Sequence, residues 1–381
     1  MESARRPYAR AVAMLIGTIV GAGIFGVPYV FARAGVSVGL VHLAVLTGAV
    51  LLVHLWFGEL TLRTTAHHRL VGYAGRYFGM PGRILASLSG VLGMWGALLA
   101  YIVLAGAFLE QLFGQMFGGS AWHYSIVFAL VASVAVLFGL RLIEEIEFVF
   151  TAFIFMAIAL IAIVGIQRVD PVHLSLTNMA NVFLPYGVVL FSLGGVSAIA
   201  EIRDTLRGSE RLLPRAIAWG TLLAAALTAV FAIIVVGVSG PHTTEDAIAG
   251  LTPTLGASVV ILGAILGFST ILTSFLMLGL YTRNVFHLDF RLPRAAAFLL
   301  GVGVPIAVFL LGQPGFIEIL MVTGAIFAGL DGILVALVVL AARRHGDRDP
   351  EFRVRLPAFV NYLVALIFII GMVVTIRELL A

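Results

Sequence analysis

The 381-residue chain contains neither cysteine nor lysine, and only 11% of its residues are charged. Without cysteine it can form no disulfide bond and no thiolate metal site, and the sequence does not indicate whether its compartment is oxidising or reducing. It also lacks the His-Glu-x-x-His motif of zinc enzymes and the P-loop of nucleotide-binding enzymes. We therefore expect a protein that is not an enzyme and needs no cofactor beyond a coupling ion.

Apolar residues are what the chain has in excess. They make up 61% of it, and the mean hydropathy is +1.11. No soluble core is so apolar, and repeated apolar runs of about 18 residues or more predict membrane helices. We expect an all-α membrane protein, a single domain over residues 1–381, with eleven spans at about residues 10–33, 38–62, 84–113, 124–141, 147–166, 180–200, 215–238, 254–282, 295–311, 315–340 and 357–376.

The arginines predict the orientation of these spans. If the N-terminus is cytoplasmic, all of the 23 arginines except Arg33, Arg168 and Arg377 fall in inner segments. Such an excess on one side is the positive-inside signal of multi-pass proteins in the cell membrane. With eleven spans, the C-terminus is then outside. Because the charges serve topology, the basic pI does not indicate a nucleic-acid partner.

Two glycine clusters lie in the middle of apolar spans. Residues 21–26, Gly-Ala-Gly-Ile-Phe-Gly, interrupt the first span, and residues 192–195, Ser-Leu-Gly-Gly, interrupt the sixth. An odd number of spans per half gives repeats of opposite direction, so residues 10–166 and 180–340 predict an inverted five-plus-five repeat, with 357–376 as an extra helix. Interrupted helices at matching places in such repeats point to a transporter site at the midplane of the membrane.

Each interruption frees backbone groups of one polarity. At the start of the second half of span one, the amides of Ala22, Gly23 and Ile24 would face the cavity with the positive end of a helix dipole behind them, which suits a carboxylate. In span six, free carbonyls near Leu190, Phe191 and Ser192 suit an ammonium group. Together they describe a zwitterionic amino acid. The competing interpretation is close helix packing, since Gly17 and Gly21 form a small-xxx-small pair.

Span eight carries four hydroxyl groups within residues 269–274. Oxygen atoms are the ligands that hard cations prefer. We predict a possible Na⁺ site of five ligands, the side chains of Thr273 and Ser274 and the carbonyls of Gly17, Val20 and Thr270. The alternative is that these hydroxyls bond to their own helix or to a neighbouring one.

Ionisable residues inside the membrane are costly and count as functional candidates. His54 lies in span two, Asp331 lies in span ten, and Glu59 and Glu201 lie at the inner ends of spans two and six. We expect the two glutamates to act as gate or anchor residues paired with inner arginines. The role of Asp331 stays open, and it or His54 offers a proton relay.

Residues 17–28, Gly-Thr-Ile-Val-Gly-Ala-Gly-Ile-Phe-Gly-Val-Pro, resemble the first-helix motif of amino acid permeases in the amino acid–polyamine–organocation superfamily. Residues 96–101 and 191–202 are similar to its aromatic amino acid permease and amino acid/auxin permease branch. The chain departs from auxin-type relatives at Ala200, where many carry proline. The resemblance also implies the inverted fold and a site between spans one, three, six and eight. The predicted substrate-binding residues are Thr18, Gly21, Ala22, Gly23, Ile24, Tyr101, Leu190, Phe191, Ser192 and Gly194.

Together these features predict a secondary active transporter of amino acids, hydrophobic or aromatic ones first. Uptake would be cation-coupled, as spans one, two, six and seven move against the others. Residues 272–274 resemble the sodium-site stretch of Na⁺-coupled members of this fold, which slightly favours Na⁺ over H⁺. A proton-coupled symporter or an exchanger is the alternative, and a membrane receptor or scaffold that binds an amino acid without moving it is the alternative of another class. The sequence carries no signal of oligomeric state.

Overall fold

The computed structural model describes residues 2–66, 68–138, 155–156 and 158–380, and the regular elements within these ranges are helices. In this part of the chain nine helices are long and apolar enough to cross a membrane, and one bent pair makes a tenth candidate. Residues 147–154 and 157 of the expected span at residues 147–166 lie outside the described residues, and a shorter apolar helix, Ile158–Arg168, covers the end of that span. The all-helical class is confirmed, whereas the count of eleven and the repeat layout stay predictions.

The long helices coincide with the predicted apolar runs. In chain order they are α1 (Glu2–Ile19) with α2 (Gly23–Ala34), α3 (Val36–Arg63), α4 (Leu70–Phe117), α5 (Ala121–Phe138), α8 (Leu184–Ser192) with α9 (Val196–Thr205), α10 (Leu213–Ser239), α12 (Ala257–Asn284), α13 (Arg294–Phe298) with α14 (Val304–Gly312), α15 (Phe316–Val322) with α16 (Gly329–His345), and α17 (Ala358–Leu380). Short helices α7 (Pro171–Ser175) and α11 (Thr252–Leu255) lie in the connections.

Single turns of other helix types complete the chain. Turns of 3₁₀ helix are η1 (Ile166–Arg168), η2 (Met179–Asn181), η3 (Glu210–Leu212), η4 (Gly240–His242) and η5 (Ala249–Leu251). Turns of π-helix are η6 (Val285–Asp289), η7 (Leu299–Gly303) and η8 (Thr323–Ala328).

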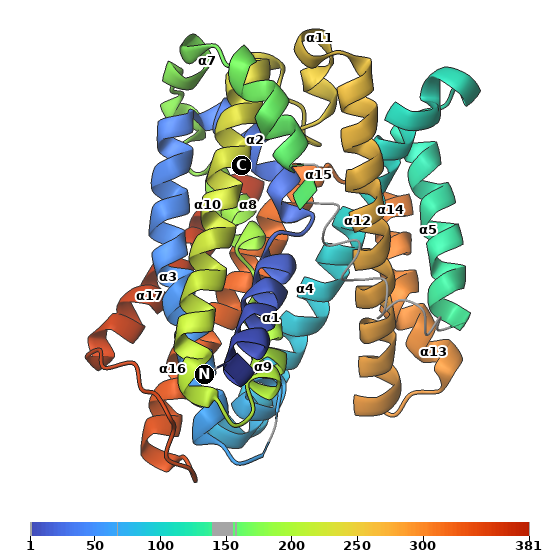
Figure 1. Ribbon diagram of the computed structural model, residues 1–381. Coiled ribbons are helices and arrows are strands. Elements are labelled where there is room, and N and C mark those ends of the chain that lie inside the picture. The colour runs from blue at the N-terminus through green and yellow to red at the C-terminus, as the bar shows by residue number, and fades with distance from the viewer. Residues whose placement is uncertain (1, 67, 139–154, 157, 381) are drawn as a thin grey trace.

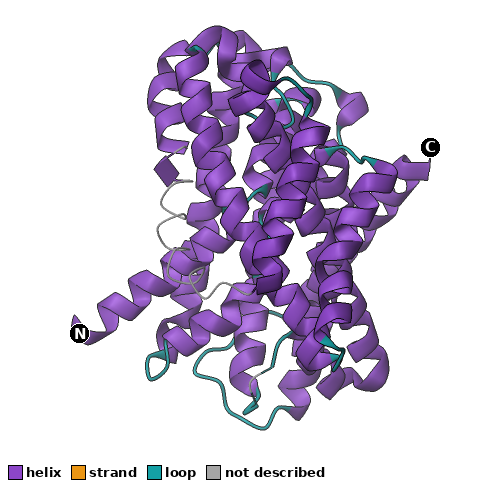
Figure 2. Ribbon diagram, turned by 90° about the vertical axis from the view of Figure 1, so that its right-hand side faces the viewer, coloured by secondary structure: helices purple, strands orange, loops and turns teal. Residues whose placement is uncertain are grey.

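The helices form one bundle of roughly upright elements, with the two termini towards opposite ends (Figures 1 and 2). Helices α1, α2, α3, α8, α9 and α10 pack mainly on one another, and α12 packs on α4 and α5. The segment from α15 to α16 lies between these groups, since it contacts α8 and α3 as well as α4.

Helix α4 is longer than the predicted span. It begins at Leu70, bends at Gly79, whose φ is 66°, and continues past Pro81 to Phe117. A positive φ suits glycine, because it has no Cβ to clash with the backbone. Residues 84–113 thus form the membrane part of α4, and the turns before Gly79 occupy the connection between spans two and three.

Phe25 anchors the outer half of the first span. Its ring lies edge-on to Phe108 of α4 at 5.3 Å and to Phe231 of α10 at 6.0 Å. All three side chains are buried, and edge-to-face aromatic pairs contribute about 0.5–1.5 kcal/mol each beyond their buried area. The cluster fixes α2 directly beyond the interruption.

Candidate functional site

The first span is interrupted at residues 20–22, and α1 and α2 meet there at an angle of 54°. Helix α1 ends as the Val20 amide donates to the Ile16 carbonyl at 2.7 Å and the Gly21 amide donates to the Ile19 carbonyl at 2.9 Å. Among the described residues, no backbone carbonyl accepts a hydrogen bond from the amide of Ala22 or Gly23. These two buried N–H groups are therefore available to an anion.

The prediction that the Ile24 amide is also free is wrong for this conformation. It donates to the Gly21 carbonyl at 3.3 Å, and Phe25 donates to Ala22 at 3.2 Å. The reason is that the first turn of α2 already forms at this point, so helical hydrogen bonds take up the amides from Ile24 onwards. Of the three backbone amides predicted to donate to a carboxylate, two are thus free in this conformation.

The sixth span is interrupted at residues 193–195, between α8 and α9. The carbonyl of Phe191 accepts from the Gly194 amide at 3.1 Å. Within the described chain, no backbone amide donates to the carbonyls of Leu190 and Ser192. Two of the three predicted carbonyls are therefore free, and the third keeps one lone pair.

The two interruptions touch. A Cβ atom on Gly23 would lie 2.7 Å from the Cα atom of Ser192 and 2.9 Å from Cδ1 of Phe191, so only glycine allows this approach. Helix α2 begins at its interruption and α8 ends at its own, and the two helices pack against each other. The positive end of one dipole therefore lies beside the negative end of the other, which suits a ligand carrying both charges.

Thr18, Gly21 and Gly194 flank these breaks. The Thr18 hydroxyl donates to the Met14 carbonyl of its own helix at 2.9 Å, and its side chain is exposed. Gly21 is half-buried and has open space around it, since a Cβ there would come no closer than 3.7 Å to another atom. Gly194 belongs to the unwound turn, where its amide hydrogen bond to Phe191 shapes the second break.

The Tyr101 hydroxyl on α4 lies close enough to the Ser274 side chain on α12 to interact with it. The structure therefore brings together one residue predicted for the substrate and one predicted for the ion. A tyrosine deep in the membrane needs such a partner. This pair joins two helices of the group formed by α4, α5 and α12.

The hydroxyls of α12 bond to their own helix. Thr270 donates to Leu266 at 3.1 Å, and Thr273 donates to Thr270 at 3.0 Å and to Ser269 at 3.3 Å. A hydroxyl that donates in this way keeps its lone pairs for a cation. The other two predicted ligands, the carbonyls of Gly17 and Val20, belong to the end of α1, which packs on α9 and α10 and not chiefly on α12.

The two candidates for a proton relay are His54 and Asp331. His54 is fully buried, shares a hydrogen bond of 2.9 Å between its Nδ1 and Oγ1 of Thr221, and has no partner for Nε2 within the described chain. Its Cε1 lies 3.1 Å from where a Cβ of Gly195 would be, so His54 abuts the second interruption. Asp331 accepts a hydrogen bond of 2.7 Å from Ser89 of α4.

Glu59 is paired with two arginines, as expected, whereas their inner location stays a prediction. Its buried carboxylate accepts from Arg63 at 2.8 Å and from Arg343 at 2.8 and 3.1 Å, and the backbone amide of Val354 donates to it at 3.1 Å. This cluster joins the inner ends of α3 and α16 to the segment before α17. A buried carboxylate with so many donors is well compensated.

The sequence reasoning did not identify Gly324 of span ten. A Cβ on Gly324 would lie 1.9 Å from the Gly187 carbonyl oxygen and 2.7 Å from the Phe191 amide nitrogen. Gly324 belongs to η8, a π-helical turn beside the second interruption, and such turns are frequent at functional sites. The signal was available in part, because Gly324 and Gly187 are glycines within predicted spans.

Comparisons with known proteins agree with this architecture. The model of the family described as "Tryptophan/tyrosine permease family" matches residues 6–377. Two proteins of Haemophilus influenzae, named tyrosine-specific transport system 1 and 2, are 24% and 27% identical to this chain; each alignment covers 95% of it and 94% and 93% of the relative, respectively.

A solved structure shares the fold. The crystal structure of MhsT in complex with L-phenylalanine has a TM-score of 0.62 to this chain, with 18% sequence identity. The match covers 97% of this chain and 98% of that one. The likeness therefore extends over all the spans described above, including both interrupted ones.

Proposed function

Since the chain belongs to the tryptophan/tyrosine permease family, we propose that it is a secondary transporter that takes up aromatic amino acids across the cell membrane by alternating access. The names of the two tyrosine transport systems and the phenylalanine-bound neighbour support an aromatic substrate. In this proposal the cytoplasmic end is the one that carries the N-terminus. The group formed by α1, α2, α3, α8, α9 and α10 moves against the remaining helices.

One observation carries the proposal. Free amides at Ala22 and Gly23 lie beside free carbonyls at Leu190 and Ser192, because Gly23 contacts Ser192 directly. The amides would bind the carboxylate of the substrate, and the carbonyls would bind its ammonium group. Backbone groups bind the carboxylate and ammonium groups that all amino acids share. Selectivity for one substrate side chain must therefore come from the residues around them, with Tyr101 as the first candidate.

Binding is tested by a thermal-shift screen of the purified protein against the twenty amino acids, with and without Na⁺. A ligand of the folded state raises the melting temperature by mass action, so tyrosine, tryptophan and phenylalanine should give the largest increases. Transport is tested by counterflow of labelled tyrosine in proteoliposomes. Saturable binding without counterflow would identify a receptor in place of a transporter.

For the coupling ion we propose Na⁺ first, bound by Thr273 and Ser274 with carbonyls of α12 and of the first interruption. The Thr273 hydroxyl donates to the carbonyl of Thr270 and keeps its lone pairs for a cation, which supports a Na⁺ site here. Replacing Na⁺ by choline should then abolish accumulation. Thr273→Ala should raise the half-saturating Na⁺ concentration about tenfold, equivalent to about 1.4 kcal/mol. Ser269→Ala is the matched control, because that hydroxyl is exposed and bonds to Ile265 on the same helix.

Coupling to H⁺ is the second candidate, and the buried Asp331 and His54 favour it. Under this alternative, choline leaves uptake unchanged and an inward proton gradient drives it. Asp331→Asn and His54→Gln would then each be tested for loss of gradient-driven accumulation. Counterflow without a gradient should persist in the variant that removes the relay, since exchange needs no net proton movement.

A further inference from the structure

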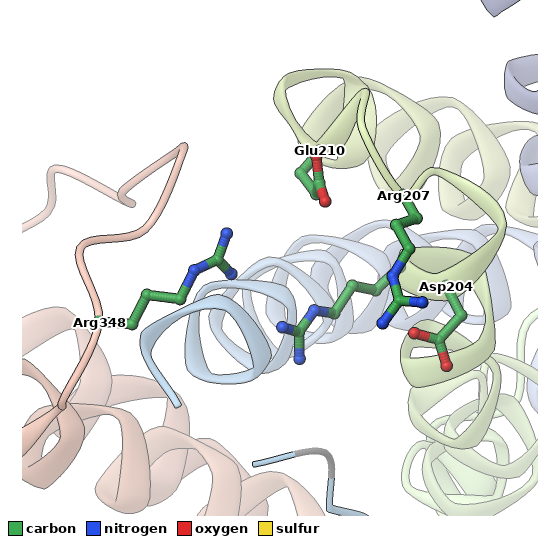
Figure 3. A pocket seen from close by; sticks show the side chains of 5 residues that line it. Asp204, Arg207, Glu210 and Arg348 are labelled. Carbon is green, nitrogen blue, oxygen red and sulfur yellow. The ribbon is translucent and has the colours of Figure 1, made fainter. Parts of the chain in front are cut away.

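A small polar cavity opens beyond the end of α9, at the end of the molecule that carries the N-terminus. It has a volume of about 200 Å³ and is lined by Arg203, Asp204, Arg207, Glu210 and Arg348 (Figure 3). The first three residues come from the end of α9 and the turn after it, Glu210 comes from η3, and Arg348 comes from the segment between α16 and α17. Three separate stretches of chain thus meet around one space.

Arg203 is the central observation. It is only 8% exposed, and within the described chain its Nη1 has no hydrogen-bond partner although it is buried. The guanidinium lies close enough to Tyr73 of α4 to interact with its hydroxyl group. A buried guanidinium that keeps an unused N–H loses hydration without compensation, so a partner for Nη1 is expected in the cavity that it lines.

The guanidinium groups around the cavity differ in how far they are compensated. Asp204 and Glu210 line the cavity with the three arginines (Figure 3), and Glu351 pairs with Arg348. Arg348 is held in place: its Nη1 donates to the Leu62 carbonyl at 3.3 Å, and its Nη2 bonds to Glu351. Asp347 next to it is engaged with Arg76 at 3.0 Å and leaves the cavity charge unchanged.

We propose that this cavity binds an oxyanion of the phosphate type, either free phosphate or the phosphate of an anionic lipid headgroup. Arg203 belongs to the last turn of α9, Arg207 belongs to the turn that follows it, and Arg348 approaches from the segment after α16. A phosphate offers several oxygen atoms to donors from different directions, and guanidinium forks match it well. A carboxylate has only two oxygens for three arginines.

An ordered water molecule would be the simplest partner for Arg203, because a cavity of this size holds several. A charged acceptor, however, forms a shorter and stronger hydrogen bond with a guanidinium N–H than water does, so an oxyanion is the better partner for the buried Nη1 of Arg203. Bound anion would also join the inner end of the broken sixth span to the segment after α16. The site therefore lies where occupancy would restrain movement of α9.

The test measures the melting temperature of the full-length protein in detergent as potassium phosphate replaces potassium chloride at constant ionic strength. A second arm compares nanodiscs of phosphatidylglycerol with nanodiscs of phosphatidylcholine. We expect stabilisation by phosphate, by phosphatidylglycerol, or by both, and the arm that responds identifies the source of the phosphate group. In Arg203→Gln, half-maximal stabilisation should need about tenfold more of the responding probe, as expected for loss of a charge-assisted hydrogen bond.

Arg211→Gln is the matched control, because Arg211 is an exposed neighbour in η3 that does not line the cavity. It should respond like the unmodified protein. The proposal is overturned if neither probe stabilises the protein or if Arg203→Gln responds like the unmodified protein. It is also overturned if Arg211→Gln needs as large an increase in probe concentration as Arg203→Gln. Should Arg203→Gln fail to fold, Arg207→Gln replaces it, since that side chain is exposed and its loss leaves no buried cavity.

Discussion

The two interrupted spans differ in polarity although the same kind of glycine cluster produces them. The first is bent by 54° and exposes amides, because α2 begins there. The second stays within one span of 22 residues and exposes carbonyls, because α8 ends there. Each interruption has a helix that ends and a helix that begins, and the packing of α2 on α8 brings the amides of the first interruption beside the carbonyls of the second.

They also differ in what surrounds their glycines. Gly23 faces backbone, since its nearest neighbour is the Cα atom of Ser192. Gly195 faces side chains, because a Cβ atom there would lie 2.8–3.1 Å from atoms of Ile19, His54 and Leu15. Side-chain ends can move by a few tenths of an ångström, whereas two backbones held by their own helices cannot. Substitution by alanine should therefore reduce uptake more at Gly23 than at Gly195.

Gly23→Ala should have the largest effect. Its methyl group would lie 2.7 Å from Ser192 Cα and force α2 and α8 apart at the point where the free amides and carbonyls meet. Overpacking of this kind costs about 1–3 kcal/mol, so tyrosine uptake in proteoliposomes should fall about tenfold or more. Gly48→Ala on α3 is the control, because its methyl group would have no neighbour within 4 Å. Normal uptake by Gly23→Ala would contradict the shared site.

Gly195→Ala should have an intermediate effect. The side chains of Leu15 and Ile19 can rotate away, so we expect uptake to fall only about two- to fivefold. The ratio of the two losses is the informative quantity, measured under one set of conditions together with melting temperatures. Equal losses would mean that both breaks are packed alike, and the contrast between backbone and side-chain surroundings would have to be abandoned.

Much of this arrangement could be predicted from local sequence. Apolar runs located the spans that the structure describes, and both glycine clusters overlap the interruptions, because they report local weakness of a helix. The second agrees to within a residue, whereas the first break ends at residue 22, four residues before the end of its cluster. What could not be predicted depends on register between helices distant in sequence. The contact of Gly23 with Ser192 and the approach of Gly324 to Gly187 are examples.

The prediction of a free Ile24 amide failed for a related reason. A helix start can shift by one or two residues without changing the sequence pattern, and here the first turn of α2 already uses that amide. The cavity at Arg203 was equally invisible, since Arg203 and Arg348 are 145 positions apart and only tertiary packing brings them to one space. The distribution of arginines along the sequence predicts the orientation of the spans, but it does not indicate which arginines lie close together in the fold.

Ser192→Ala should have the smallest effect. The Ser192 hydroxyl donates to the Val189 carbonyl of its own helix at 2.9 Å, so it takes no part in freeing the backbone. Its loss removes a neutral hydrogen bond worth about 0.5–1.5 kcal/mol and should lower the melting temperature slightly, with less than about a twofold change in tyrosine uptake. The carbonyl of Ser192 remains in place in the variant. A large loss of uptake with an unchanged melting temperature would assign substrate binding to the Ser192 side chain in place of its backbone carbonyl. The carbonyl of Leu190 would then be the free carbonyl that binds substrate at the second interruption.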